Sequence, residues 1–166
     1  MLPFLNNKSL LAGEMKSVDR SFWTGARALV AQPAAIAQIG ALCLREGETG
    51  TEVLMVKSSR GRWIIPKGWP EDHLTDRETA RAEAWEEAGV RKGKVSKAPV
   101  GGYLTEKRYD DGRRIPCHVT VYRIDVRKTS KDYPEAGERR RKWMPLKKAA
   151  KKTKDSGLRA LLKSML

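Results

Sequence analysis

The feature that most constrains this chain is a run of three glutamates, Glu83, Glu86 and Glu87. Positions three and four residues apart lie on one face of an α-helix, so a helix here brings three carboxylates close together. Like charges at this distance repel each other unless a positive charge lies between them. A hard divalent cation such as Mg2+ prefers oxygen ligands and would supply that charge. The alternative for such a run is an acidic surface exposed to solvent.

The residues around the glutamates predict a loop over residues 67–74 followed by a helix. Thr75, with Glu78 three residues later, fits a capping box, which marks the first turn of a helix. The helix is expected to run to about Ala88, where Gly89 supplies the C-terminal stop. Small residues at every fourth position of this segment would let the helix lie close to a sheet.

Apolar runs outside the helix predict a sheet. The expected strands span residues 35–44, 51–58, 63–65, 95–108, 114–126 and 138–143, and the turn 110–112 fits a hairpin between two of them. Because the strands come mostly in hairpins with helices between them, we expect an α/β (α+β) fold with a mixed sheet. Leucines of the last segment repeat with helical spacing, which favours a final helix that docks on the domain with its lysines outward.

The charge of the chain points to anionic partners. The net charge is +14, and residues 138–166 hold eleven Lys and Arg residues against two acidic ones, a net +9. A surface this basic attracts polyanions, so the C-terminal segment could bind RNA or a long polyphosphate. The alternative is a solvated helix face without a specific ligand.

Several features bound the class of protein and its location. Cys43 and Cys117 each sit in an apolar run and are expected to be buried thiols in a reducing compartment, which favours a cytoplasmic location. Residues 28–44 carry no charge, but they are interrupted and short for a membrane span, so no membrane partner is expected. Residues 1–33 are interpreted as an N-terminal extension, and residues 34–166 as a single domain that includes the basic C-terminal helices.

The segment from Gly68 to Val90 resembles the Nudix box, G-x5-E-x7-R-E-U-x-E-E-x-G-U, in which U is aliphatic. The matching positions are Gly68, Glu83, Ala84, Glu86, Glu87, Gly89 and Val90. The approach through residues 63–68 also looks like the strand that enters this box in many Nudix hydrolases. The resemblance extends over most of residues 34–165 and implies a Nudix-type α/β/α sandwich with a mixed β-sheet.

The resemblance also implies an activity and its site residues. Nudix hydrolases cleave diphosphate linkages by attack of water on phosphorus, with bound Mg2+ or Mn2+. Carried over to this sequence, Glu83, Glu86 and Glu87 become catalytic residues and metal ligands, and the Gly68 carbonyl becomes a further metal ligand. One of the glutamates, or a carboxylate elsewhere, would orient the water.

Two positions depart from the Nudix pattern. Leu74 occupies the position of the first glutamate, and Ala82 that of the arginine. Arg81 lies one residue early, which rotates its side chain by about 100° around the helix. One interpretation is that packing of Leu74 and Ala82 replaces an ion pair, which can be neutral for stability. The other is that activity is weakened or lost.

The strong positive charge and the approach through residues 66–68 resemble the branch of the family that acts on diphosphoinositol polyphosphates and diadenosine polyphosphates. Candidate substrate-binding residues are Arg60, Arg62, Lys67 and Arg114, each of which could instead be a solvated surface charge. Two alternatives stay open: a non-catalytic Nudix-fold module that binds a nucleotide or RNA, and an RNA 5′ pyrophosphohydrolase.

Overall fold

The computed structural model describes residues 35–166, and the predicted extension at residues 1–33 lies outside the described residues. The described part contains an eight-stranded mixed sheet. Its strands are β1 (Ile36–Gly47), β2 (Gly50–Lys57), β3 (Trp63–Ile64), β4 (Lys67–Gly68), β5 (Val90–Val95), β6 (Gly101–Arg108), β7 (Arg114–Thr129) and β8 (Arg141–Pro145). The central order is β3-β2-β1-β7-β5, while β4 pairs with β1, β6 with β7 and β8 with β2.

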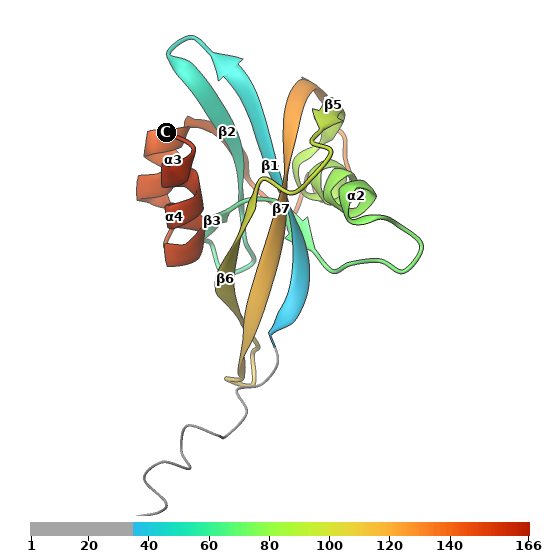
Figure 1. Cartoon of the computed structure of the whole chain (residues 1–166), viewed down its shortest axis with the longest axis vertical. Coiled ribbons are helices and arrows are strands. Elements are labelled where there is room, and N and C mark those ends of the chain that lie inside the picture. Colours follow the sequence, from blue (N-terminus) through green and yellow to red (C-terminus); the bar gives the residue numbers. More distant parts are fainter. Residues whose placement is uncertain (1–34) are drawn as a thin grey trace, which may run out of the picture. The chain divides into compact units, whose positions relative to one another are not determined.

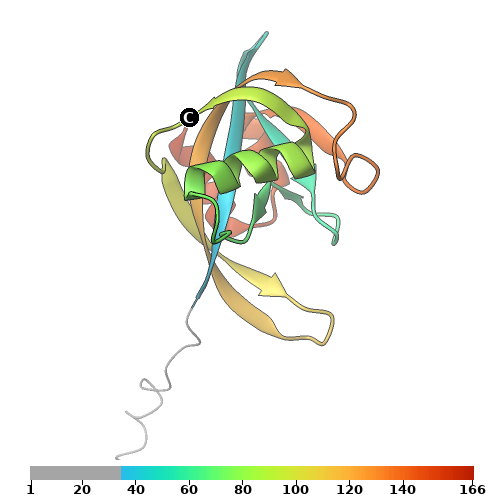
Figure 2. The same cartoon turned by 90° about the vertical axis from the view of Figure 1, so that its right-hand side faces the viewer.

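Helices cover both faces of this sheet (Figure 1). Helix α2 (Asp76–Ala88) lies on one face, and α3 (Leu146–Lys152) and α4 (Ser156–Ser164) lie on the other. Figure 2 shows α2 crossing in front of the strands. The predicted α/β/α sandwich with a mixed sheet is therefore confirmed.

The two helical layers explain the apolar character of the central strands. β1 and β7 run parallel through the middle of the sheet, and every other pairing is antiparallel. In β1, Leu42 packs toward α3 and α4, while Ala41 and Cys43 pack toward α2. Strands buried on both faces are continuously apolar rather than alternating. Cys43 and Cys117 are both buried and free, as predicted.

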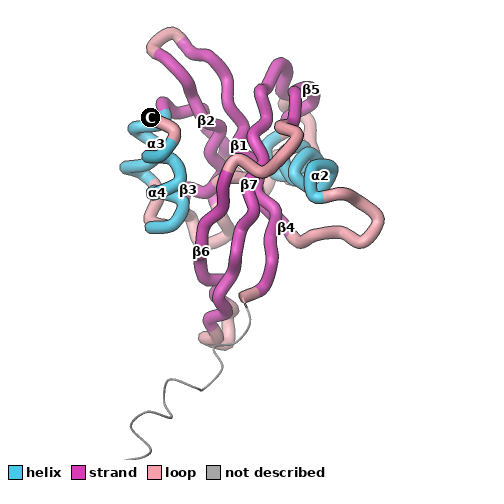
Figure 3. Tube along the Cα trace, viewed as in Figure 1, coloured by secondary structure: helices cyan, strands magenta, loops and turns pink. Residues whose placement is uncertain are grey.

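Two strands differ from the prediction. The pair Lys67–Gly68, expected to be a loop, forms β4 against Ile39 and Gly40 of β1. The strand expected over residues 95–108 is β6 only from Gly101 on, and β5, which begins at Val90 and ends at Val95, was not predicted; residues 96–100 lie between the two strands (Figure 3). Pro99 lies in this break, and proline cannot donate a ladder hydrogen bond, which favours interruption of a strand there.

The ends of α2 follow the prediction closely. The Thr75 and Glu78 side chains form a complete capping box, and Gly89 ends the helix with a left-handed φ of 65°. The last turn of α2 has no basic residue of its own. Arg141 of β8 instead donates a hydrogen bond to the Ala88 carbonyl, which places a cation at the negative end of the helix dipole.

The outer face of α2 differs from expectation at one residue. A tryptophan in the middle of an amphipathic helix is expected to be buried, yet Trp85 is half-buried and lines an apolar groove with Leu74, Ala82 and Val90. The two positions that depart from the Nudix pattern therefore share one apolar surface. They share this groove with Trp85, whereas the three glutamates line a different pocket.

The C-terminal segment docks as the leucine spacing predicted. Leu158, Leu161 and Leu162 of α4 are buried in the core layer that also contains Leu146 of α3. The lysines of both helices are exposed. Among residues 35–166, no helix has both the length and the apolar character needed to span a membrane.

Candidate active site

The three glutamates of α2 open onto a pocket of about 430 Å³. Its walls come from β1, the turn between β2 and β3, β4, α2, β6, the segment before β8 and the N-terminal end of α4. Among the side chains that line it, we call the glutamates of α2 with Glu135 the acidic side, and a set of lysines and arginines the basic side; Glu106, Arg139 and Asp155 also line the pocket. The basic side consists of Arg60, Arg62, Lys67, Lys107 and Arg108.

Close packing of Gly68 against Glu83 positions the acidic side. A Cβ atom at Gly68 would lie 1.8 Å from the Glu83 carboxylate oxygen Oε1, so any side chain here would displace the carboxylate. Burial, together with repulsion from Glu87 and Glu86, raises the pKa of Glu83 to about 7. Among residues 35–166, no Lys, Arg or His side chain forms a salt bridge with Glu83 or Glu86.

Glu87 is the most enclosed of the three glutamates, with 6% of its surface exposed. Its Oε1 lies 3.1 Å from Nη2 of Arg139, and its Oε2 accepts a hydrogen bond of 3.2 Å from the Lys67 backbone N–H. Burial raises the pKa of Glu87 to about 7, against the opposing effect of Arg139. Arg139 also pairs with Glu135, so a second carboxylate joins this network.

On the basic side, Lys67 projects into the pocket and its Nζ donates a hydrogen bond of 2.7 Å to Gln38 Oε1. Burial lowers the pKa of Lys67, with nearby anionic groups including Glu87 acting in the opposite direction. A partly buried ammonium that is held by a neutral amide keeps donors available for an anion. Arg62 lines the same pocket.

The other two predicted substrate-binding arginines have different surroundings. Arg60 lines the pocket, but its guanidinium donates to Asp110 at 3.1 Å and to the Arg108 carbonyl at 3.4 Å, so it ties the β2–β3 turn to the β6–β7 hairpin. Arg114 is not among the pocket-lining residues, and its nearest acidic partner is Glu106, at 3.8 Å.

The carboxylate oxygens of the three glutamates are ligands of the type that Mg2+ and Mn2+ prefer. The site is nevertheless not a preassembled cage. Among residues 35–166, no three Asp, Glu, His or Cys side chains converge as a ligand cluster. Coordination by fewer carboxylates with added backbone or water oxygens suits Mg2+, which usually keeps several waters. The oxygen donors and the Gly68 cradle fit such an ion.

Sequence reasoning missed several residues of the pocket. Glu135 and Arg139 reach α2 because the Glu135 backbone N–H donates to the Glu86 carbonyl at 3.0 Å. Gln38 comes from β1, and the Thr105 hydroxyl donates to Asp155 at the pocket edge. The four-residue spacing of Glu135 and Arg139 was the only local signal, and it does not indicate proximity to α2.

The NUDIX domain family profile matches residues 36–165. The chain is 36% identical over 102 residues to Nudix hydrolase 12, mitochondrial, of Arabidopsis thaliana, covering 59% of this chain and 50% of that protein. It is 36% identical over 115 residues to human diphosphoinositol polyphosphate phosphohydrolase 3-alpha, covering 66% of this chain and 64% of that protein. The match to the plant protein thus spans about half of that relative's length.

Solved structures share the fold at low sequence identity. The crystal structure of C. elegans Ap4A hydrolase has a TM-score of 0.60 and 18% identity, covering 79% of this chain and 96% of that chain. The NUDIX domain of Shewanella oneidensis NrtR, solved with ADP ribose, has a TM-score of 0.56 and 15% identity, covering 89% and 97%. Together with the family match over nearly all described residues, these findings show that the chain belongs to the Nudix family.

Proposed function

We propose that this domain hydrolyses a diphosphate linkage in a phosphorylated substrate, with Mg2+ or Mn2+ bound by oxygens of Glu83, Glu86, Glu87 and the Gly68 carbonyl. The observation that carries the proposal is the pocket itself, which is lined both by the three glutamates of α2 and by the basic side chains of Lys67 and Arg62. A substrate phosphate chain between these two sides would contact the divalent cation on the acidic side and Lys67 and Arg62 on the basic side.

In the proposed reaction, water attacks phosphorus, a new P–O bond forms and the bridging P–O bond breaks. The released phosphate group leaves with the bridging oxygen, and the water proton passes to a carboxylate of the acidic side. The divalent cation would offset charge that develops on the phosphate oxygens.

Other residues of the chain position these groups. Arg139 and the Lys67 backbone fix Glu87, and Gly68 allows the close approach of Glu83. Lys67 and Arg62 would bind substrate phosphates, and Arg60 would do so after release of Asp110. Arg114, which pairs with Arg108 beside the β6–β7 turn, stays a predicted substrate contact for a ligand that extends beyond the pocket.

The proposed substrate class is a highly phosphorylated molecule. Two of the similar proteins are named for diphosphoinositol polyphosphate and Ap4A, and the basic side of the pocket suits several phosphates of either kind. The buried free thiols of Cys43 and Cys117 are consistent with the cytoplasmic location proposed from the sequence.

A phosphate-release screen tests the activity. The substrates are diadenosine polyphosphates, inositol pyrophosphates, nucleoside triphosphates, ADP-ribose and 5′-triphosphorylated RNA, each with Mg2+ and with EDTA. We expect Mg2+-dependent turnover of at least one substrate, and a loss of roughly a hundredfold or more in Glu86→Gln and Glu87→Gln. Glu48→Gln is the matched control, since Glu48 is exposed in the turn between β1 and β2.

A specific observation favours one alternative function. Glu87 already has protein partners on both oxygens, as expected if the network were purely structural. The domain would then bind a nucleotide without cleaving it. No turnover of any substrate, together with nucleotide binding that Glu86→Gln and Glu87→Gln leave unchanged, would reject the hydrolase and support this binding module.

A further inference from the structure

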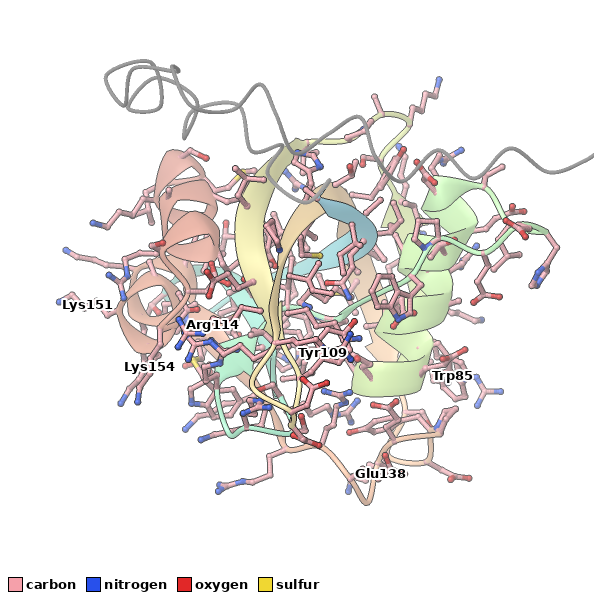
Figure 4. The ribbon with its side chains drawn as sticks, turned by 90° about the horizontal axis from the view of Figure 1, so that it is seen from below. Trp85, Tyr109, Arg114, Glu138, Lys151 and Lys154 are labelled. Carbon is pink, nitrogen blue, oxygen red and sulfur yellow. The ribbon has the colours of Figure 1, made fainter. Side chains whose placement is uncertain are left out.

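Helix α3 and the turn after it expose a set of lysines that we call the α3 lysine patch. It consists of Lys147, Lys148, Lys151, Lys152 and Lys154, all of them exposed. The helix buries its other side, including Ala149 and Ala150, in the core. No salt bridge within residues 35–166 involves a lysine of the patch. Figure 4 shows Lys151 and Lys154 projecting away from the ribbon, across the molecule from Trp85 on α2.

The α3 lysine patch begins at the edge of the active-site pocket. Asp155, the residue after Lys154, lines the pocket, caps α4 and accepts a hydrogen bond from Thr105 of β6. Lys107 lies two residues beyond Thr105 in the same strand, so both side chains point to the same face of β6. Lys154 is therefore the residue of the patch that adjoins the pocket lining directly along the chain.

The mouth of the pocket also offers aromatic surface. Trp69 lines the pocket with 43% of its surface exposed, which is unusual for a large apolar side chain. Lys107 Nζ lies 4.3 Å from the centroid of the Trp69 ring and 5.6 Å from that of Tyr109. Accessible aromatic rings beside cations are the combination by which proteins stack bases of single strands and hold their phosphates.

We propose that the α3 lysine patch binds the phosphodiester backbone of a single-stranded RNA whose 5′ end enters the active-site pocket. The base nearest the 5′ end would stack on Trp69, and the following phosphates would cross Lys107 to reach Lys154 and Lys151. A 5′-triphosphate end supplies the diphosphate linkage, so the catalytic part of this inference rests on the proposed function. The binding part does not.

Two triple variants with equal loss of charge test the patch in the full-length protein. One is Lys148→Gln/Lys151→Gln/Lys154→Gln. The matched control is Lys92→Gln/Lys94→Gln/Lys97→Gln, in and just after β5 at the opposite end of the sheet, where all three lysines are also exposed. The probe is a fluorescent 12-nucleotide RNA with a 5′-hydroxyl, which binds without offering a linkage to cleave. Affinity is measured by anisotropy across salt concentrations.

The patch variant is expected to bind this RNA at least about tenfold more weakly than the parent. The affinity of the control variant is expected to fall by less than about threefold. Each phosphate contact to a single strand contributes about 0.7 to the slope of log affinity against log salt, so three lost contacts reduce the slope by about 2. Trp69→Ala is expected to weaken binding further through lost stacking. In steady-state assays, the KM for 5′-triphosphorylated RNA rises more in the patch variant than the KM for diadenosine tetraphosphate.

Three results would overturn the inference. Equal weakening in the two triple variants would show that only net charge matters. A second such result has two parts: inorganic polyphosphate or anionic vesicles compete with RNA equally well at equal charge, and Trp69→Ala leaves RNA binding unchanged. Together they would assign the patch to a ligand without bases. Unchanged RNA binding in the patch variant would exclude it as the site. If the parent hydrolyses no substrate but the binding difference persists, the proposed hydrolase fails while the RNA surface stands.

Discussion

The Arg139 guanidinium and the Glu87 carboxylate lie 3.1 Å apart, with 23% and 7% of their side chains exposed. This pair joins the segment before β8 to the glutamate face of α2. A pair so enclosed leaves a costly unpaired charge when one partner is removed. Arg139 is therefore a positioning residue for Glu87, and it supplies support that the substituted positions Leu74 and Ala82 do not.

Arg139→Gln is expected to lower the free energy of unfolding by about 1–3 kcal/mol, because Glu87 loses its charged partner in an enclosed site. Urea denaturation measures this change. Arg140→Gln removes the same charge from the adjacent exposed residue and should stay within about 0.5 kcal/mol of the parent. In the double variant with Glu87→Gln the cost should be smaller than in Arg139→Gln alone, and additive costs would argue against coupling.

Gly68→Ala is expected to displace the Glu83 carboxylate, since the new Cβ would lie 1.8 Å from its Oε1. A displacement of about 1 Å in such a site can reduce kcat/KM roughly a hundredfold. Mg2+-dependent turnover and Mn2+ binding by calorimetry measure the effect. Gly137→Ala is the control, because a Cβ there meets no atom within 4 Å. Normal Mn2+ binding in Gly68→Ala would exclude Glu83 and Gly68 as neighbours in the metal site.

The raised pKa of Glu83 predicts how stability depends on pH in EDTA. A folded-state pKa of about 7, above the usual 4.5, favours the protonated carboxyl in the folded protein. Its stabilising effect is present below pH 4.5 and is lost as pH rises through about 7. Glu83→Gln mimics the neutral acid, so it should stabilise the protein relative to the parent more at pH 8 than at pH 5.5. An equal difference at both pH values would contradict the shift.

Restoring the charged residues of the Nudix pattern at Leu74 and Ala82 tests whether their loss affects stability and activity. Leu74→Glu alone places a carboxylate in the apolar groove beside Trp85 and should cost about 1 kcal/mol of unfolding free energy. Ala82→Arg added to it should recover part of this cost through pairing. Because Arg139, the Lys67 backbone and Gly68 hold the glutamates, kcat/KM of the double variant should stay within about threefold of the parent, less than 1 kcal/mol of transition-state free energy. A larger gain would show that the substitutions weaken the site.

Local patterns in the sequence were sufficient for the elements that depend on neighbouring residues. The capping box at Thr75, the stop at Gly89 and the glutamate face of α2 are set by contacts within a few residues, and the structure has all of them. The docking of α4 followed from its leucine spacing for the same reason. These features, with the Nudix box, were enough to assign the fold and the family.

Only the tertiary structure decided what surrounds the glutamates. Arg139 reaches Glu87, Lys67 bonds to Gln38, and Arg60 is held by Asp110, and in each case the partners are distant in the sequence. No periodicity or spacing encodes such contacts, because they arise where separate strands and loops converge on one pocket. The same convergence places the α3 lysine patch beside that pocket, through the hydrogen bond between Thr105 and Asp155. The sequence by itself determined the acidic helix face, whereas packing of the sheet determined which charges oppose it.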